Sequence, residues 1–231
     1  MNVDVAGLRA GYGSATILEE VGFGVPNHGA LAIVGRNGMG KSTLLKTVMG
    51  YLKPSRGTVT VAGRNVTGWP TYRLTRLGVA YAAQEKSLFG ELSVEDNLSV
   101  GKGRKCPPET RDEVISYFPV LGQRLRQKAG TLSGGEQKML TLAKALVAVP
   151  DLLVLDEISD GLGPAVITQV GVALRALRER HGCTILMVEQ NLDLSLEVAD
   201  RVAVLKLGSL IFEKASNEPG LRDELVTQLA P

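Results

Sequence analysis

Nine consecutive residues combine glycine, lysine and hydroxyl side chains in a pattern that suits phosphate binding. Glycines leave room for a tight loop that turns its backbone N–H groups inward around a phosphate. The lysine brings a compact positive charge within reach of the β- and γ-phosphates, and the serine after it offers a small oxygen ligand to Mg²⁺. The pattern therefore predicts a site for a nucleoside triphosphate and Mg²⁺. Its residues are Gly35, Arg36, Asn37, Gly38, Met39, Gly40, Lys41, Ser42 and Thr43.

The segments on either side of this loop support the same interpretation. Residues 30–34 form a short apolar run of strand length, and residues 44–49 continue as a helix. The N-terminal end of such a helix attracts anions through its dipole and its free N–H groups. A glycine-rich turn with an incidental lysine is the alternative, but it needs neither flank, so the context favours the phosphate site.

Two acidic residues, Asp156 and Glu157, follow directly after the fully apolar run 152–155. In a parallel sheet the carboxyl end of that strand would lie beside the phosphate loop. Asp156 is suited to hold Mg²⁺ directly or through water, and Glu157 can polarise the attacking water or accept its proton. Two acids that end a strand by accident are the alternative. With the loop upstream, the pair predicts hydrolysis of the bound nucleotide.

The stretch Leu132-Ser133-Gly134-Gly135-Glu136-Gln137 is the most diagnostic in the chain. A serine and paired glycines at the start of a helix present a hydroxyl and free N–H groups to an anion. Alone, such a triplet is a common turn. With a phosphate loop about 90 residues earlier and Asp-Glu about 20 residues later, it resembles the signature of the ABC (ATP-binding cassette) ATPases, and the resemblance covers essentially the whole chain.

The resemblance implies roles for two further residues and a second chain. Tyr12 resembles the aromatic residue that stacks on adenine in this family, with a core tyrosine at a strand end as the alternative. Gln84 resembles the glutamine that contacts Mg²⁺ and the attacking water. In the family two cassettes pack head to tail, and each ATP lies between one chain's phosphate loop and the other chain's signature. Isolated monomers are then expected to hydrolyse ATP poorly. The signature residues expected at the partner's ATP are Ser133, Gly134 and Gly135.

The chain departs from the family pattern at three places. Ile158 stands where a proline is common, and the dimer-contact loop at residues 159–162 lacks its usual terminal aspartate. Gln190 stands where most members carry a histidine. An amide can donate a hydrogen bond to the γ-phosphate at every physiological pH, whereas a histidine can also change charge. We expect Gln190 to be a fixed γ-phosphate sensor, with an amide facing solvent at a strand end as the alternative.

The departure at Gln190 also narrows the resemblance within the family. The stretch Glu189-Gln190-Asn191, taken with residues 131–137 and 161–164, resembles the ATP-binding subunits of branched-chain amino acid transporters. The resemblance is to the branch that pairs with a second, non-identical cassette. Amides, urea or another small polar solute are the alternative cargoes.

The expected fold is α/β, with the mostly parallel sheet of a P-loop NTPase core of the ABC ATPase type, an antiparallel β subdomain and an inserted α-helical subdomain. One ABC ATPase domain is expected over residues 1–231, with the nucleotide-binding core at 1–84 and 150–231 and the helical subdomain with the signature at 85–149. Beyond the segments already named, strands are expected at 3–9, 20–25, 57–63, 79–83 and 183–188 and as a pair within 201–213, and helices at 70–77, at 164–180 and at the C-terminal end.

Composition and the N-terminal segment exclude several classes of protein. The net charge is +2, from 26 Lys and Arg against 24 Asp and Glu, without a dense basic run, so no nucleic-acid partner is expected. No signal peptide and no apolar run of bilayer-spanning length are visible, which favours the cytoplasm. Cys106 and Cys183 lie far apart without metal-ligand companions and are expected to be reduced thiols.

The sequence thus predicts an Mg²⁺-dependent ATPase subunit of an ABC importer, on the cytoplasmic face of the inner membrane. Its cofactors are ATP and Mg²⁺. Its expected partners are a second cassette, possible also as a homodimer in isolation, two transmembrane permease subunits and, indirectly, a solute-binding protein. A soluble chromosome or repair ATPase would carry long coiled coils between the phosphate loop and the signature, and no sustained heptads occur there. Translation-factor cassettes normally come as two in one chain.

Overall fold

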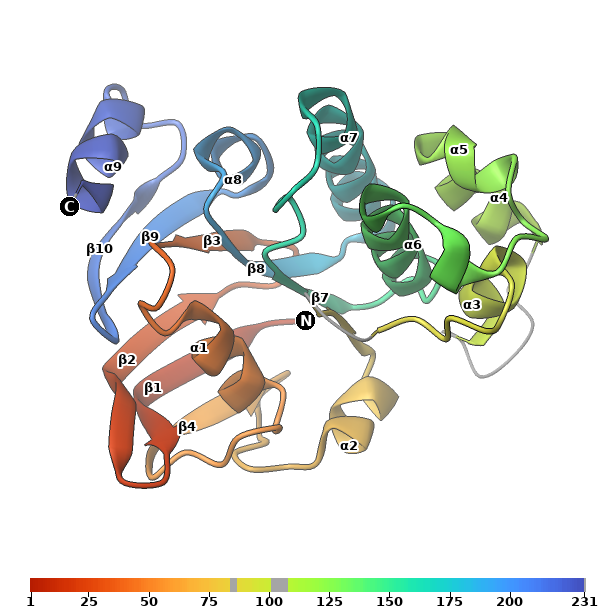
Figure 1. Ribbon diagram of the computed structural model, residues 1–231. Helices are drawn as coiled ribbons and strands as arrows, with labels where there is room; N and C mark the ends of the chain where they lie inside the picture. Colours follow the sequence, from red (N-terminus) through yellow and green to blue (C-terminus); the bar gives the residue numbers. More distant parts are fainter. Residues whose placement is uncertain (84–86, 101–107, 231) are drawn as a thin grey trace.

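The computed structural model describes residues 1–83, 87–100 and 108–230, and its strands form two sheets (Figure 1). The smaller sheet is antiparallel and has the order β2-β1-β4-β5. Val3 at the start of the long strand β1 pairs with Val25 on one side and with Val61 on the other. The strands of this sheet are β1 (Val3–Tyr12), β2 (Ala15–Val25), β4 (Arg56–Val61) and β5 (Arg64–Asn65).

The larger sheet has six strands in the order β10-β9-β3-β8-β7-β6. The pairs from β9 to β6 are parallel, and only the edge strand β10 runs antiparallel to its neighbour. The central strands carry the carboxyl ends that build nucleotide sites in such sheets. The strands are β3 (Ala30–Val34), β6 (Val79–Ala82), β7 (Leu152–Asp156), β8 (Thr184–Glu189), β9 (Arg201–Lys206) and β10 (Ser209–Ala215).

The central strands are mostly apolar because both of their faces are covered. Every residue of β3, β7 and β8 is buried. Successive side chains point to opposite faces, so Ala30 and Ala32 join one hydrophobic cluster while Leu31 and Ile33 join the other. The sheet is therefore the wall between two cores, as expected for a parallel sheet of this kind.

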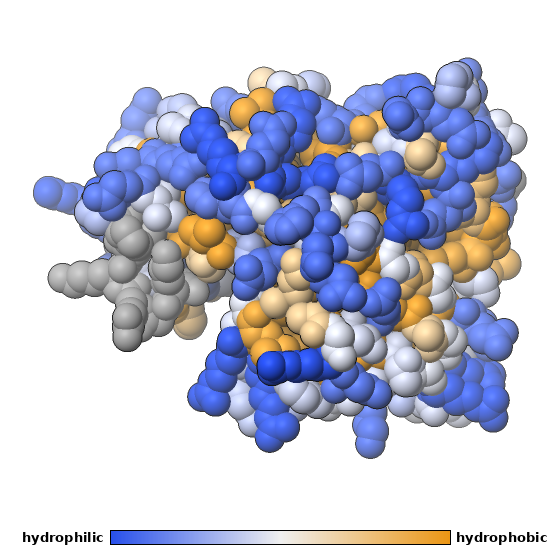
Figure 2. Space-filling view, turned by 180° about the vertical axis from the view of Figure 1, so that it is seen from behind, coloured by the Kyte–Doolittle hydropathy of each residue, from blue (hydrophilic) through white to orange (hydrophobic). Residues whose placement is uncertain are grey.

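Helices and the smaller sheet cover the two faces of the larger sheet unequally (Figure 1). One face is covered by α1 (Lys41–Val48) together with the antiparallel sheet. The other face is covered by α6 (Gly134–Leu146), α7 (Pro164–His181) and α8 (Leu192–Val198). At the surface, α2 (Thr71–Arg76) follows Pro70, and α9 (Leu221–Leu229) lies near the C-terminus. The face seen in Figure 2 is mostly hydrophilic, with smaller apolar patches.

Several helices gather at one side of the larger sheet around α6 (Figure 1). They are α3 (Val94–Val100), α4 (Pro108–Tyr117), α5 (Pro119–Gly122) and the 3₁₀ turn η1 (Ala129–Thr131). Phe118 and Leu121 are fully buried there, in the same cluster as Leu140 of α6. None of the helices within the described ranges is long and apolar enough to cross a membrane.

The structure confirms the predicted α/β fold, with its mostly parallel sheet and separate antiparallel sheet. One helix, α8, was missed by the sequence patterns. It has only seven residues and begins after Asn191, whose side-chain oxygen accepts a hydrogen bond from the Leu194 N–H at 2.9 Å. Asparagine is a preferred residue at this position, which was the available signal. The helix at the phosphate loop also begins earlier than expected, at Lys41.

Candidate functional site

The phosphate loop connects the end of β3 to the first residue of α1. Gly40 precedes the helix with a φ of 103°, a conformation that residues with a side chain rarely adopt. A Cβ atom on Gly35 would lie 2.6 Å from the Leu205 carbonyl oxygen, so this position also excludes a side chain. The loop is therefore shaped by close backbone approach at one end and by a left-handed glycine at the other.

The ammonium group of Lys41 is held by three oxygens. It donates to the carbonyl oxygens of Gly35 at 2.6 Å and Arg36 at 2.8 Å, and it lies 2.9 Å from Glu157 Oε1. The Lys41 and Glu157 side chains are only 3% and 8% exposed. Three oxygens match the three donors of an ammonium group. The ion pair thus joins the phosphate loop to the segment after β7.

Glu157 itself has an unusual backbone. Its φ is 47°, in the left-handed region, and its N–H donates to the Val188 carbonyl oxygen at 3.0 Å. Non-glycine residues in this region are uncommon, and they concentrate at functional sites. The turn after β7 therefore directs the Glu157 carboxylate toward the phosphate loop at a cost in backbone strain.

Both carboxylate oxygens of Asp156 are held by hydroxyl groups. Oδ1 accepts from Ser42 Oγ at 3.1 Å, and Oδ2 accepts from the Tyr81 hydroxyl at 3.0 Å. Burial raises the pKa of Asp156, and these two hydrogen bonds oppose the rise. Sequence reasoning did not identify Tyr81, which lies on β6 opposite Val154 of β7. Gln84, the other residue expected at the metal, lies outside the described residues, as does Cys106.

A recess of about 340 Å³ opens over the phosphate loop. Tyr12 lies at its edge and is 50% exposed, so it is not a core residue. No residue of the predicted signature is among the described residues that line this recess. Its lining is formed by Tyr12, Ile17, Asn37, Gly38, Gly40, Lys41, Ser42, Thr43 and Glu157.

Gln190 reaches the phosphate loop from the end of β8. Its Nε2 donates to Asn37 Oδ1 at 2.8 Å, although the residue itself is exposed. The preceding residue, Glu189, is 1% exposed and accepts hydrogen bonds from Ser159 N–H at 3.1 Å and Ser159 Oγ at 2.5 Å. Burial raises the pKa of Glu189, and its hydrogen bonds oppose the rise. Sequence reasoning assigned no role to this carboxylate.

The predicted signature forms the start of α6. Ser133 caps the helix: its Oγ accepts from the Glu136 N–H at 3.4 Å, while a Glu136 carboxylate oxygen accepts from the Ser133 N–H at 2.9 Å. Ser133 and Gly134 are exposed, and a Cβ atom on Gly134 would meet no atom within 4 Å. These two residues thus present their surface to solvent, and neither is among the described residues that line the recess over the phosphate loop.

Comparison with known proteins establishes the family. The family model described as ABC transporter matches residues 18–160. The chain belongs to this family. It is therefore an ATP-binding ABC ATPase, which hydrolyses ATP to ADP and phosphate.

Several relatives resemble this ABC ATPase over nearly its whole length. A probable branched-chain amino acid transport ATP-binding protein, LivF, of Archaeoglobus fulgidus is 37% identical over 214 residues, which cover 91% of each chain. The high-affinity branched-chain amino acid transport ATP-binding protein BraG of Pseudomonas aeruginosa is 36% identical over 219 residues, covering 92% of this chain and 94% of that protein. Among solved structures, a nucleotide-free ATP-binding cassette from an ABC transporter has a TM-score of 0.84 and 25% identity, and the match covers 98% of this chain and 96% of that one.

In this ABC ATPase a series of contacts connects the signature helix to the phosphate loop. Lys138 of α6 donates to the Asp160 carbonyl oxygen. Ser159, which precedes Asp160, donates hydrogen bonds to the carboxylate of Glu189. Gln190 follows Glu189 in the chain and donates to Asn37 of the phosphate loop. The loop after β7 therefore lies between the two motifs and touches both sides.

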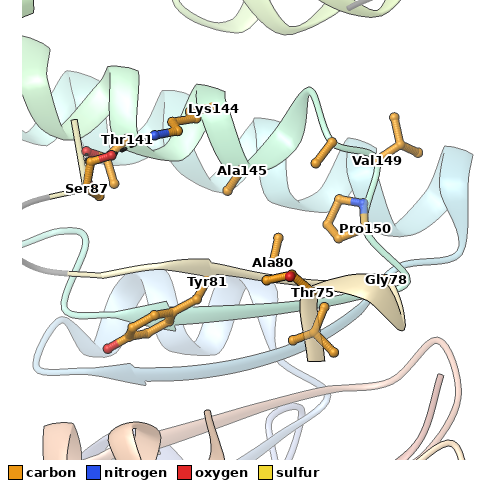
Figure 3. A pocket seen from close by; sticks show the side chains of 12 residues that line it. Thr75, Gly78, Ala80, Tyr81, Ser87, Thr141, Lys144, Ala145, Val149 and Pro150 are labelled. Atoms are coloured by element: carbon orange, nitrogen blue, oxygen red, sulfur yellow. Dashed lines mark hydrogen bonds between the residues drawn. The ribbon is translucent and has the colours of Figure 1, made fainter. Parts of the chain in front are cut away.

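A second recess, of about 370 Å³, separates β6 from α6 (Figure 3). Lys144 crosses its upper side and donates to the Ser87 carbonyl oxygen at 2.8 Å, and the hydroxyls of Ser87 and Thr141 lie 2.8 Å apart. Burial lowers the pKa of Lys144. This cavity lies where the ABC ATPase core meets the helices around α6. It is lined by Thr75, Gly78, Val79, Ala80, Tyr81, Ser87, Thr141, Lys144, Ala145, Ala148, Val149 and Pro150.

Proposed function

We propose that this chain is the ATPase subunit of an importer for branched-chain amino acids. Two relatives with more than a third of their residues identical are named as branched-chain amino acid transport ATP-binding proteins. The sequence Glu189-Gln190-Asn191 supports the same branch. Cargo does not contact this chain, so the substrate is assigned through the subunits with which the chain assembles.

The recess over the phosphate loop is proposed to bind ATP. Its open volume, its loop of backbone N–H groups and the buried Lys41 ammonium suit a triphosphate. Tyr12 offers an exposed aromatic face at the edge of the recess for the adenine ring. For Lys41 to reach the phosphates, its contact with Glu157 must lengthen, and that change releases the carboxylate to act on water.

The residues beside the phosphate loop fit a magnesium ion. Ser42 Oγ and Asp156 Oδ1 lie 3.1 Å apart, and hydroxyl and carboxylate oxygens are the ligands that Mg²⁺ prefers. We assign Ser42, Asp156 and Gln84 to this ion, whose chemistry is to neutralise charge on the β- and γ-phosphates. Glu157 then orients the attacking water and takes its proton, and Gln190 donates to the γ-phosphate.

Hydrolysis is proposed to require a second cassette. The signature does not line the recess of its own chain, and it leaves Gly134 open to approach from outside. Two chains packed head to tail would bring Ser133, Gly134 and Gly135 of each onto the ATP of the other. By the resemblance, the natural partner is a non-identical cassette, and a homodimer is a possible form in isolation.

The recess of Figure 3 is proposed to receive a permease subunit. It lies between β6 and α6, at the border of the nucleotide-binding core (residues 1–84 and 150–231) and the helical subdomain (residues 85–149) that we assign within one ABC domain. Two permease subunits would place the pair of cassettes on the cytoplasmic face of the inner membrane and link them to a solute-binding protein. Closure by ATP and reopening after hydrolysis would drive the permease.

The ion pair of Lys41 with Glu157 at the phosphate loop carries this proposal, and Glu157→Gln tests it. The variant keeps the loop and loses the base, so it should retain ATP while its turnover falls by roughly a hundredfold or more. Nucleotide retention and steady-state phosphate release in the assembled complex measure both effects. Turnover at the parental rate would remove Glu157 from the catalytic role.

The cargo is tested by reconstitution with the permease and solute-binding chains that copurify. Leucine, isoleucine or valine on the binding protein should stimulate ATP hydrolysis in proteoliposomes. Stimulation by urea or an amide, and not by these amino acids, would assign a different importer while leaving the ATPase function intact.

A further inference from the structure

Tyr81 is a half-buried hydroxyl donor beside the proposed magnesium ligand Asp156. It lies in the middle of β6, and its hydroxyl donates to Asp156 Oδ2 at 3.0 Å. Burial, reinforced by the negative charge of Asp156, raises its pKa well above the usual range. A carboxylate can only accept hydrogen bonds, so the Tyr81 hydroxyl is the donor in this contact.

With this contact, each oxygen of the Asp156 carboxylate accepts a hydrogen bond from a hydroxyl group. Ser42 Oγ bonds to Oδ1 and Tyr81 bonds to Oδ2, so the plane of the carboxylate is set from both ends. When the Ser42 hydroxyl is engaged by a cation, the Tyr81 hydroxyl is the donor that continues to orient the carboxylate. Such supporting hydrogen bonds orient metal ligands and tune their affinity.

The ring that carries this hydroxyl is itself held in place. It points from β6 to the side away from α6 (Figure 3), where it packs against the hydrophobic cluster that includes α1. The backbone of Tyr81 is fixed by the pairing of β6 with β7. The ring also packs against Tyr51, with ring centroids 5.9 Å apart at an angle of 45°. A hydroxyl on a ring constrained in this way has a defined position, which is what a positioning role requires.

We propose that Tyr81 is a positioning residue that holds Asp156 in the orientation in which it binds Mg²⁺ together with Ser42. The inference rests on the proposed function of the recess. It assigns to a residue on β6 part of the metal affinity of the site, without contact to the nucleotide or to the ion.

The test compares Tyr81→Phe with Tyr51→Phe in the full chain. Both variants lose one phenol oxygen, but Tyr51 is 61% exposed and contributes only its ring to this cluster. The readout is the affinity for a fluorescent ATP analogue with Mg²⁺ and with EDTA. In Tyr81→Phe the gain in affinity on adding Mg²⁺ should fall by roughly tenfold, since hydrogen bonds to charged groups are the stronger ones. Metal-free affinity should stay unchanged, and Tyr51→Phe should match the parent.

The result that overturns the proposal is an equal Mg²⁺-dependent gain in Tyr81→Phe and the parent. A parent chain that binds no ATP would instead contradict the proposed function, so the two failures are distinct. An equal loss of affinity with and without Mg²⁺ would show a purely structural role. A double-mutant cycle with Asp156→Asn tests whether Tyr81 acts through Asp156. In the Asp156→Asn variant, adding Tyr81→Phe should not change the Mg²⁺-dependent gain in affinity any further. Additive effects of the two substitutions would overturn the proposal.

Discussion

The phosphate loop and the signature, the two motifs expected to bind ATP, differ in how many of their polar groups are paired within their own chain. At the phosphate loop, Lys41 is buried in an ion pair with Glu157, and Asp156 is bonded to Ser42 and Tyr81. At the signature, the Ser133 side chain and N–H bond within its own helix cap, and Gly134 is exposed. The first region has its charges balanced within one chain, whereas the second presents helix N–H groups to the outside.

This difference indicates a division of labour between folding and assembly. Ion pairs and hydrogen bonds across β7, β6 and the phosphate loop shape the first region as the sheet folds. The exposed helix start costs the monomer little, because its capping box satisfies part of the free N–H groups. The loop that contains Ser159 and Asp160 lies between the two regions and can transmit a change in one of them to the other.

The largest effect is expected from Lys41→Ala, which changes the phosphate-loop region. The change removes the cation of the phosphate loop, and turnover should fall by roughly a thousandfold with a loss of ATP binding. Lys46→Ala is the matched control, because Lys46 lies on the same helix but is exposed. Calorimetric ATP titration and phosphate release measure both. Equal behaviour of the two lysine variants would contradict the importance of the buried ion pair.

The next largest effect is expected from Gly134→Asp, which changes the exposed signature at the start of α6. The monomer has room for a side chain here, so folding and ATP affinity of the isolated chain should not change. In the assembled pair the new carboxylate would face the partner's triphosphate, and like-charge contact should lower turnover by roughly a hundredfold. ATP affinity of the monomer and turnover of the complex are measured side by side. Loss of ATP binding in the monomer would break the proposed division between the two regions.

A smaller effect is expected at Gln190, which follows β8 and contacts the phosphate loop. Gln190→Ala should reduce turnover by about tenfold, corresponding to the ~1.4 kcal/mol of one hydrogen bond to a charged group. Gln190→His should remain active and gain a pH dependence, because imidazole changes charge near neutral pH. Steady-state ATPase of the assembled transporter from about pH 6 to 9 compares the three proteins. Unchanged turnover in the alanine variant would rule out a sensing role.

The smallest effect concerns stability at Glu189, the last residue of β8, which accepts hydrogen bonds from Ser159 of the connecting loop. Burial raises its folded-state pKa, so the folded protein holds the proton more tightly than the unfolded chain. That stabilisation is complete below the unfolded pKa of about 4.5 and is lost as the pH rises through the folded pKa. In Glu189→Gln this component is absent, so the parent should lose stability relative to the variant as the pH rises. Urea unfolding between about pH 4.5 and 7 tests this, and a constant difference would contradict it.

Local motifs were the part of the site that sequence could predict. The phosphate loop is one continuous segment whose glycine spacing dictates its shape. Asp156 ends a strand that its apolar run identifies, and Glu157 follows directly. The start of α6 was readable in the same way, since Ser133 and Glu136 have capping-box spacing. For each of these, neighbouring residues determine the geometry, and the α/β class followed from the same alternation of apolar runs.

Only the tertiary structure decided which of these segments touch. The Tyr81 contact with Asp156 spans 75 positions and the Gln190 contact with Asn37 spans 153, and both depend on the strand order β3-β8-β7-β6. Glu189 found Ser159 because β8 lies next to β7. Strand order is set by the burial of two cores and not by any local pattern. The sequence alone therefore determined which residues can bind phosphate, and folding decided which side chains hold them in place.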